Sequence, residues 1–461
     1  MDRLSGLDAF FLYLESPTQP LNICCVLELD TATMPGGYTF DRFRAALTQR
    51  VDAVPEFRLK LANNQLNFDH PVWVDDEDFD LARHLRRVGL PSPGGHMELA
   101  EICGHIAGLP LDRAHPLWEM CVIAGLHGDD GLAVVLKAHH ALVDGVGGAN
   151  LLAHLSSTIP DAPPPKPAAR AGGANPLHIA ASGLIGAALR PWRLANILPA
   201  TVATVAKTVL RAHRGGHTMA APFAAPRAAF NGPFTSRRNV AFSDVDLEDV
   251  KTVKKRFGVT VNDVVTALCS GALRQFLLDR GELPDSPLVA SVPVSVHDKS
   301  DRPGRNQTTL MLCRLETHIG DPAERLTSIS NGNTAAKDHA ASMGPSLLQD
   351  WLQLAGQTMF GAAMKLLPRI PMPENPAHNM VMSNVPGPQE QLYFLGCKVD
   401  GAYPLGPIIA GAGLNITVMS LNGRLGVGII SCPDLLPDLW EIADGFPAAL
   451  KELLECAAPQ A

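Results

Sequence analysis

Two adjacent histidines, His139 and His140, stand in the stretch KAHHALVDGVGG at 137–148. The second is followed four residues later by Asp144 and then by Gly145. An imidazole titrates near neutral pH, so a histidine can take a proton from one group and return it to another. A carboxylate at this spacing can fix the local loop, and a glycine permits a turn that a Cβ would obstruct. The pattern suits a base that activates a hydroxyl or an amine.

The HxxxD spacing also occurs by chance, so its surroundings decide how much it means. An apolar run leads directly into the histidines and the glycine-rich GVGG follows them, unlike an ordinary polar surface turn. The sequence contains no GxSxG, HExxH or GxxxxGK[ST] motif, and no GxGxxG that opens a helix after a strand. Without a nucleophile motif, direct transfer is favoured over a covalent acyl-enzyme.

The elements predicted for the amino-terminal part of the chain place the two histidines at the end of a strand. Residues 21–30 are predicted to form a strand, because they are rich in buried-type and β-forming residues. Residues 117–140 are typical of two strands that reverse at HGDDG (127–131), and GVGGANLLAHLSS (145–157) begins a helix. A strand end on a rigid scaffold holds such side chains in register.

The second half mixes helices and strands. Asp246 is predicted to cap a helix that Gly258 ends, and a second helix ends at Gly281. Asn422–Gly423 predicts a two-residue hairpin turn between two alternating strands. Further strands are predicted within 287–296, 307–316 and 378–386. Because strands and helices do not alternate regularly, the fold class is mixed α/β (α+β) rather than doubly wound.

The bulk composition narrows the class of protein. A chain of 461 residues predicts two domains, and 46% hydrophobic with 18% charged residues fits a packed globular protein. The net charge of −8 argues against a nucleic-acid binder. Nine dispersed cysteines without a CxxC predict buried thiols in a reducing compartment and no metal site. No signal peptide or spanning segment was found, so we expect a cytoplasmic protein.

A basic connector separates the two halves. Between Ala162 and Ser243 there is no Asp or Glu, while ten Lys and Arg residues fall there. The chain has 38 Lys and Arg residues in all, so the part outside this segment has 28 of them against 46 Asp and Glu residues. Its net charge is therefore −18. Parts of the connector (179–198 and 200–216) have an amphipathic helical pattern. The hypothesis is that this segment docks on an anionic lipid surface; contact with the phosphates of a substrate and a solvated linker are the alternatives.

Several motifs together resemble one family. HHALVDG (139–145) is similar to the HHxxxDG motif of the bacterial wax ester synthase/acyl-CoA:diacylglycerol acyltransferase family, within the chloramphenicol acetyltransferase-like and condensation-domain superfamily. The amino-terminal LSGLDAFFLYLESPTQPLN is similar to the family's first segment. Further matches follow in the family's order: PLW (116–118), ND (262–263), VPVSV (292–296) and SNVPGP (383–388).

The resemblance implies an activity and roles for residues. The activity is transfer of a long-chain acyl group from acyl-CoA to diacylglycerol or a fatty alcohol, with no cofactor or metal. His140 would be the general base, His139 would support its geometry, and Asp144 with Gly145 would shape the site. Asn262 would lie near the reacting carbonyl, where a preformed donor stabilises negative charge. Trp118 and Asp263 would contact the substrate or support the site. The structural alternatives are core packing for Trp118 and a capping box with Thr260 for Asp263.

The resemblance also implies an architecture. Two chloramphenicol-acetyltransferase-like halves (1–160 and 239–461) would flank the connector (161–238), with the active site and a tunnel at their interface. One position departs from many relatives: His297 follows PVSV where they have arginine, so the arginine partner of Asp144 is open between Arg302 and Arg305. A condensation-type transferase with a carrier-bound thioester and a non-catalytic lipid-binding homologue remain the alternative functions.

Overall fold

The computed structural model describes residues 2–62, 68–128, 131–143, 152–169, 175–213, 219–295, 308–343, 346–354 and 374–457. Five residues discussed above lie outside this part of the chain: Asp144, Gly145, His297, Arg302 and Arg305. The start of the helix predicted at 145–157 also lies outside it.

One strand of the first large sheet ends at His139, directly before His140. The seven strands of this sheet run in the order β5–β6–β7–β2–β14–β13–β8. The predicted pair over 117–140 is confirmed as antiparallel β6 and β7, and β2 pairs with β7 so that Asn22 lies opposite His139. The bounds are β2 Asn22–Asp30, β5 Leu85–Gly89, β6 Trp118–Ala124, β7 Gly131–His139, β8 Ser156–Ser157, β13 Tyr393–Phe394 and β14 Cys397–Leu405.

The second large sheet has six strands in the order β11–β10–β12–β15–β16–β9. The hairpin at Asn422–Gly423 is confirmed, with φ of 44° and 78° at the two turn residues of β15–β16. A three-stranded sheet, β1–β4–β3, completes the strands of the described residues. The bounds are β9 Asn239–Asp246, β10 Val289–Ser295, β11 Thr308–Arg314, β12 Met380–Pro386, β15 Leu414–Leu421, β16 Arg424–Ser431, β1 Asp2–Arg3, β3 Leu59–Leu61 and β4 Val72–Asp75.

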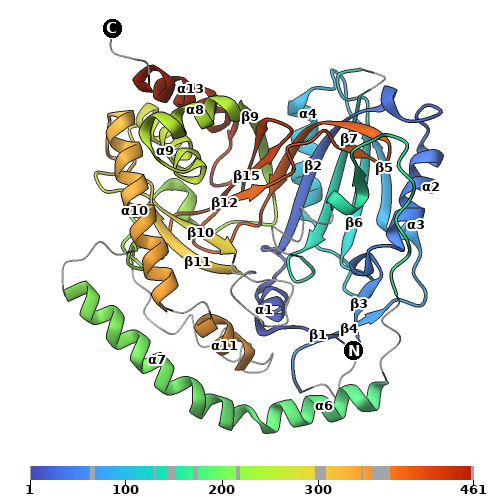
Figure 1. Ribbon diagram of the computed structural model, residues 1–461, viewed down its shortest axis with the longest axis horizontal. Coiled ribbons are helices and arrows are strands. Elements are labelled where there is room, and N and C mark those ends of the chain that lie inside the picture. The colour runs from blue at the N-terminus through green and yellow to red at the C-terminus, as the bar shows by residue number, and fades with distance from the viewer. Residues whose placement is uncertain are drawn as a thin grey trace.

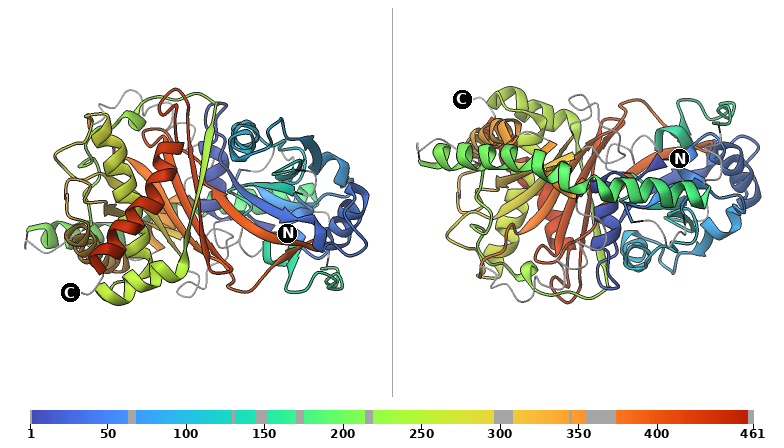
Figure 2. Two further views of the ribbon diagram at one scale, coloured as in Figure 1. Left: turned by 90° about the horizontal axis from the view of Figure 1, so that it is seen from above. Right: turned by 90° about the horizontal axis from the view of Figure 1, so that it is seen from below.

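The chain crosses between the two large sheets after β12. It forms β13 and β14 in the seven-stranded sheet, and then returns to the six-stranded sheet as β15. β14 pairs antiparallel with β2 over residues 398–405 and also contacts β15 and β16. The two sheets therefore meet along β14 in the middle of the molecule (Figure 2). The predicted mixed α/β class with two sheet-based halves is confirmed.

Helices cover the outer faces of both sheets (Figure 1). Helices α8, α9, α10 and α13 pack with the six-stranded sheet around one aliphatic core. The predicted caps of α8 are confirmed, since Asp246 accepts from the Glu248 N–H and Gly258 has a φ of 68°. The bounds are α1 Gly6–Leu14, α2 Phe40–Val51, α3 Leu81–His84, α4 His96–Gly108, α8 Leu247–Phe257, α9 Val261–Asp279, α10 Pro322–Met343, α11 Ser346–Leu354 and α13 Trp440–Ala457.

Two connector helices, α6 (Pro176–Ala188) and α7 (Arg190–His213), run along one side of the molecule beneath both halves (Figures 1 and 2). We call them the strap. Ile179, Gly183 and Gly186 are the buried positions of α6, at the spacing of one helical face. Trp351 of α11 donates its ring N–H to Thr201 of α7 at 3.0 Å. In the part of the chain that the structure describes, no helix is long and apolar enough to cross a membrane.

Candidate active site

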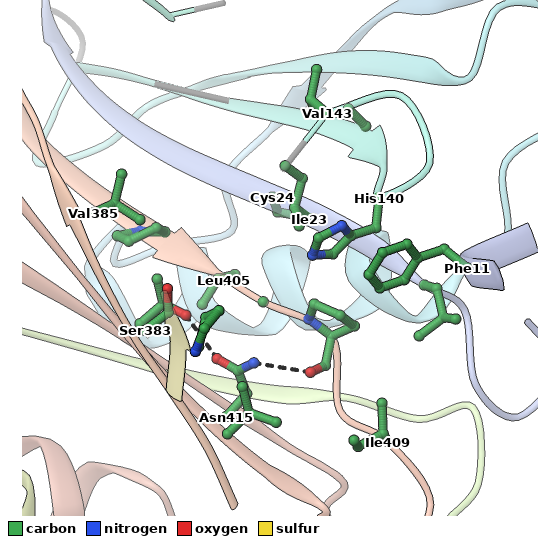
Figure 3. A pocket seen from close by; sticks show the side chains of 18 of the residues that line it. Phe11, Ile23, Cys24, His140, Val143, Ser383, Val385, Leu405, Ile409 and Asn415 are labelled. Carbon is green, nitrogen blue, oxygen red and sulfur yellow. Dashed lines mark hydrogen bonds between the residues drawn. The ribbon is translucent and has the colours of Figure 1, made fainter. Parts of the chain in front are cut away.

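A cavity of about 430 Å³ lies between the two large sheets (Figure 3). Its volume is within the range of roughly 300–1,000 Å³ that is common for small-molecule sites. The wall is mostly aliphatic and aromatic, so it can accommodate hydrocarbon. Residues of α1, β2, β7 and β14 form one side, and residues of β10, β12 and β15 form the other; they include Leu7, Phe11, Ile23, Leu136, Leu405, Pro293, Val381, Val385 and Met419.

His140 lies on this cavity, directly after the last residue of β7. Its backbone N–H donates to the Leu21 carbonyl at 2.9 Å, so the chain remains attached to the segment leading into β2 beyond the end of the strand. The imidazole points into the cavity and stacks on the Phe11 ring, with centroids 4.0 Å apart and planes 10° apart. The ring is therefore held in one orientation toward the space between the sheets.

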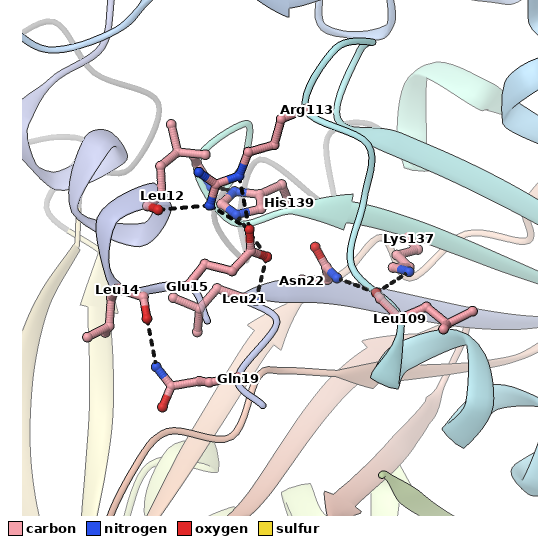
Figure 4. Close-up of polar contacts among 11 residues, drawn as sticks. Leu12, Leu14, Glu15, Gln19, Leu21, Asn22, Leu109, Arg113, Lys137 and His139 are labelled. Carbon is pink, nitrogen blue, oxygen red and sulfur yellow. Dashed lines mark hydrogen bonds and ion pairs between the residues drawn. The ribbon is translucent and has the colours of Figure 1, made fainter. Parts of the chain in front are cut away.

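His139 does not line the cavity and is fully buried beside Glu15 (Figure 4). Its Nδ1 accepts the Ala141 backbone N–H at 3.0 Å, so that nitrogen carries no proton. The remaining ring nitrogen, Nε2, lies 3.5 Å from a Glu15 carboxylate oxygen. Burial lowers the pKa of His139 despite this carboxylate, which favours the neutral ring with its proton on Nε2. His139 thereby fixes the backbone turn that carries His140.

Glu15 is the centre of a buried polar network around this turn (Figure 4). Its carboxylate accepts hydrogen bonds from the Leu21 N–H at 3.2 Å and from the Arg113 guanidinium at 2.6 Å. Burial alone would raise its pKa, but His139 and Arg113 together lower it to about 2. Glu15 thus supports His140 twice, through the ring of His139 and through the Leu21 backbone.

A second buried group, Lys137, holds β7 two residues before His139. Its Nζ donates to the carbonyls of Ile106 and Leu109 and to the carboxylate of Glu119, at 2.7–2.9 Å. Asn22 donates to the same Leu109 carbonyl, which ties β2 to the segment after α4 (Figure 4). These contacts fix the strand end from the face opposite the cavity.

The opposite wall of the cavity contains polar residues that the sequence patterns did not single out. Asn415 donates to the Pro407 carbonyl at 2.9 Å and accepts from Thr417 at 2.8 Å (Figure 3). Its amide therefore supports the wall. His378 also lines the cavity, and burial lowers its pKa. Two stretches from the sequence analysis contribute to this wall: SNVPGP supplies Ser383 and VPVSV supplies Pro293.

The other predicted site residues that the structure describes, Asn262, Asp263 and Trp118, lie away from the cavity wall. Asp263 is buried at the start of α9, where its carboxylate accepts from the Thr260 N–H and from Asn333. Asn262 precedes it and does not line the described cavity. Trp118 is buried in β6, donates to the Phe57 carbonyl at 2.9 Å and stacks on His84. Capping and packing account for the Asp263 and Trp118 contacts.

Comparison with solved structures identifies the structural class of the fold. The structure resembles the starter condensation domain of rhizomide synthetase (TM-score 0.55, 14% identity, 99% of this chain and 94% of that one). It also resembles trichothecene 15-O-acetyltransferase from Fusarium sporotrichioides (TM-score 0.58, 12% identity, 98% and 94% of the two chains). At this level of identity the likeness is in the fold, which is that of condensation domains and chloramphenicol acetyltransferase-like enzymes.

Sequence comparison then specifies the family. Residues 4–265 match the wax ester synthase/diacylglycerol acyltransferase catalytic domain, and residues 305–454 match the family's C-terminal domain. A Mycobacterium tuberculosis (strain H37Rv) protein that is named a diacylglycerol O-acyltransferase, Rv1760, is 67% identical over 460 residues, covering 100% of this chain and 91% of that protein. The wax ester synthase/diacylglycerol acyltransferase from Marinobacter aquaeolei VT8 is 30% identical with a TM-score of 0.69, covering 99% of both chains. This chain belongs to the wax ester synthase/diacylglycerol acyltransferase family of acyltransferases.

Proposed function

We propose that this protein transfers a long-chain acyl group from acyl-CoA to the free hydroxyl of diacylglycerol, with His140 as general base. The observation that supports this best is the His140 ring on an apolar cavity between the two sheets. The family and the names of its relatives supply the substrate classes. A fatty alcohol is the second acceptor, because the family's name includes wax ester synthesis.

The reaction is balanced without a covalent acyl-enzyme. One ring nitrogen of His140 takes the proton of the acceptor hydroxyl while the oxygen attacks the thioester carbonyl carbon. The tetrahedral intermediate collapses when the carbon–sulfur bond breaks, and the imidazolium returns the proton to the departing CoA thiolate. His139 and Glu15 keep the imidazole in place during both proton transfers. Asp144 and Gly145 are proposed to shape the loop after His140. The role of Asn262 as a donor near the carbonyl stays a prediction, because Asn262 does not line the described cavity.

Holding both substrates at His140 accounts for part of the catalysis. Acyl-CoA and the acceptor would enter from opposite sides of the interface between the halves at 1–160 and 239–461. Bringing two reactants together in one geometry removes several kcal/mol of entropic cost from the barrier. The aliphatic wall excludes water, which would otherwise hydrolyse the thioester.

The strap provides a surface for contact with lipid. The strap exposes large apolar residues, with exposed fractions of 77% for Leu177, 62% for Ile185, 70% for Trp192 and 66% for Val202. A cluster of this kind on a water-facing helix marks an interaction surface. Arg193 stands among them in an acid-free segment, so the partner is an anionic membrane or lipid droplet, where the acceptor is dissolved.

Vesicle flotation tests the strap. Wild type is expected to float with phosphatidylcholine vesicles that contain phosphatidylglycerol, whereas Trp192→Ser with Ile185→Ser should float markedly less. Arg193→Gln should weaken binding at low salt and matter less at high salt, because screening removes the charge attraction. Leu278→Ser, at a 43% exposed apolar position of α9, is the matched control. Unchanged flotation of the strap variants would rule out lipid docking by this surface.

The first measurement of activity compares wild type with His140→Ala. Palmitoyl-CoA is supplied with dioleoylglycerol or hexadecanol, and the esters are separated by lipid chromatography. We expect ester from the wild type and a loss of at least about 100-fold in the variant, the usual size of a general-base contribution. His105→Ala, an exposed histidine on α4, is the control and should match the wild type.

The same assay separates the alternatives. Ester from His140→Ala at the wild-type rate would exclude the general-base role. No ester from the wild type with either acceptor, but product from an acyl group on a carrier protein, would favour a condensation-type transferase. Lipid binding without any transfer would favour a non-catalytic homologue.

A further inference from the structure

Three potential metal ligands converge in the seven-stranded sheet far from His140. Glu28 comes from β2, His96 is the first residue of α4, and His127 lies in the turn after β6. One ligand atom from each of the three lies within 4.8 Å of the other two. Glu28 Oε1 and His96 Nε2 are 2.6 Å apart, and the His96 and His127 rings meet edge to face at 5.0 Å between centroids.

The backbone departs from regular geometry at His127 and in the strand that pairs with Glu28. His127 has a φ of 54°, in the left-handed region that residues other than glycine seldom occupy, and its N–H donates to the Gly94 carbonyl at 2.9 Å. Opposite Glu28, the pairing of β14 with β2 shifts register between Val399 and Gly401. Irregularities of this kind re-aim side chains, and they recur at functional sites.

We propose that Glu28, His96 and His127 bind a divalent transition-metal ion of the Zn²⁺ type, with water at the remaining position. Two imidazoles and one carboxylate are a donor set that suits Zn²⁺ and its neighbours better than Mg²⁺ or Ca²⁺, which prefer oxygen. Tetrahedral coordination at bond lengths near 2.0–2.1 Å places ligand atoms about 3.4 Å apart. The cluster needs only small side-chain movements to reach that spacing.

The three ligand residues are exposed enough for a metal ion to bind from solvent and to be released. The side chain of Glu28 is 15% exposed and that of His96 is 38% exposed, while His127 is an exposed residue, so an ion can enter from solvent. A Glu28–His96 ion pair forms without a metal, and it is the third ligand atom, from His127, that completes a donor set for an ion. Three protein ligands leave a position for water, as in zinc sites that exchange a ligand.

The position of the cluster indicates a role outside the acyl transfer. Glu28 is six residues along β2 from Asn22, the partner of His139, which corresponds to about 20 Å. An ion here would connect β2, α4 and the turn between β6 and β7. Because it binds the folded chain, the ion would raise the stability of this half without touching the reacting atoms.

Calorimetry with ZnCl₂ on metal-stripped full-length protein tests the site. We expect about one high-affinity ion per chain, a rise in the melting temperature with ZnCl₂, and no such rise with MgCl₂. His127→Asn should weaken this binding by at least tenfold, because asparagine tolerates the left-handed backbone but is a poor zinc ligand. Glu28→Gln should weaken it as well. His105→Asn, a change of the same type on α4, is the matched control and should bind as wild type does.

Each result supports or overturns the site. Loss in His127→Asn with retention in His105→Asn supports it, and visible absorption of tetrahedral Co²⁺ that disappears in His127→Asn would strengthen it. Wild-type affinity in His127→Asn, or the absence of a high-affinity ion from wild type, overturns it. If Glu28→Gln does not fold, His127→Asn alone decides, since that residue is exposed and the substitution keeps the turn.

Discussion

Phe11 and His140 stack face to face, with ring centroids 4.0 Å apart and planes that differ by 10°. Phe11 comes from α1, whose start is capped by Ser5, and His140 follows the last residue of β7. Residues 129 positions apart in the chain thus form one wall of the cavity. The amino-terminal helix therefore sets the orientation of the proposed base.

Phe11→Ala should lower the rate of acyl transfer. Stacked aromatic pairs contribute about 0.5–1.5 kcal/mol, so freeing the His140 ring should cost up to about tenfold. Phe10→Ala is the control, because Phe10 also lines the cavity and the substitution removes the same volume. Equal losses in both variants would show that cavity volume matters and stacking does not.

His139→Ala should lower kcat more than it raises KM, because the turn that carries His140 loses the acceptor for the Ala141 N–H. A misplacement of about 1 Å can cost as much as 100-fold. His139→Asn should restore most of the activity, since its side-chain oxygen can accept the same N–H. Equal activity of the alanine and asparagine variants would argue against a positioning role.

Glu15 should make stability depend on acid pH. Its pKa is about 2 in the folded protein, against about 4.3 in an unfolded chain. A lowered pKa means that the stabilisation is complete above about pH 4.3 and is lost as the pH falls through 2. Glu15→Gln should therefore lower the free energy of unfolding by about 2 kcal/mol at pH 7, with a smaller difference at pH 3.

The measurement is urea unfolding of wild type and Glu15→Gln at several pH values. Glu101→Gln, at an exposed position of α4, is the control and should leave the pH dependence unchanged. A Glu15→Gln difference that does not depend on pH would refute the assigned ion pairing.

Lys137→Met should destabilise the protein by about 3–5 kcal/mol, the usual cost of leaving a buried charge partner unpaired. The substitution removes the Lys137 ammonium group, which donates to the carbonyls of Ile106 and Leu109 and to the carboxylate of Glu119. Adding Glu119→Gln should recover part of the loss, because the remaining negative charge disappears. Thermal unfolding of the single and double variants measures this, and a purely additive loss would contradict the coupling.

Trp118→Phe separates core packing from substrate contact. The variant keeps an aromatic ring but loses the hydrogen bond to the Phe57 carbonyl, at a cost of about 1–3 kcal/mol in stability. We expect kcat/KM per folded molecule to stay within about twofold of wild type. A large rise in KM with little change in stability would instead indicate substrate contact.

Local sequence signals predicted the elements that depend on neighbouring residues. Asp246 and Gly258 bound α8, and Asn422–Gly423 forms the β15–β16 turn, because capping and left-handed turn geometry are decided within a few residues. The same reasoning placed His140 at a strand end. It also suggested two roles for Asp263, a site residue or a member of a helix capping box, and the structure contains the capping box.

The type and spacing of its residues determined that this chain has mixed α/β halves and a histidine at the end of β7, since hydrophobic periodicity and turn chemistry are local properties. Only the tertiary structure decided what surrounds that histidine. Phe11 and Glu15 precede it by more than a hundred residues, and the opposite wall follows it by a similar distance or more. The crossing of β14 into the first sheet brings these segments together, because apolar faces from distant parts of the chain must bury one another.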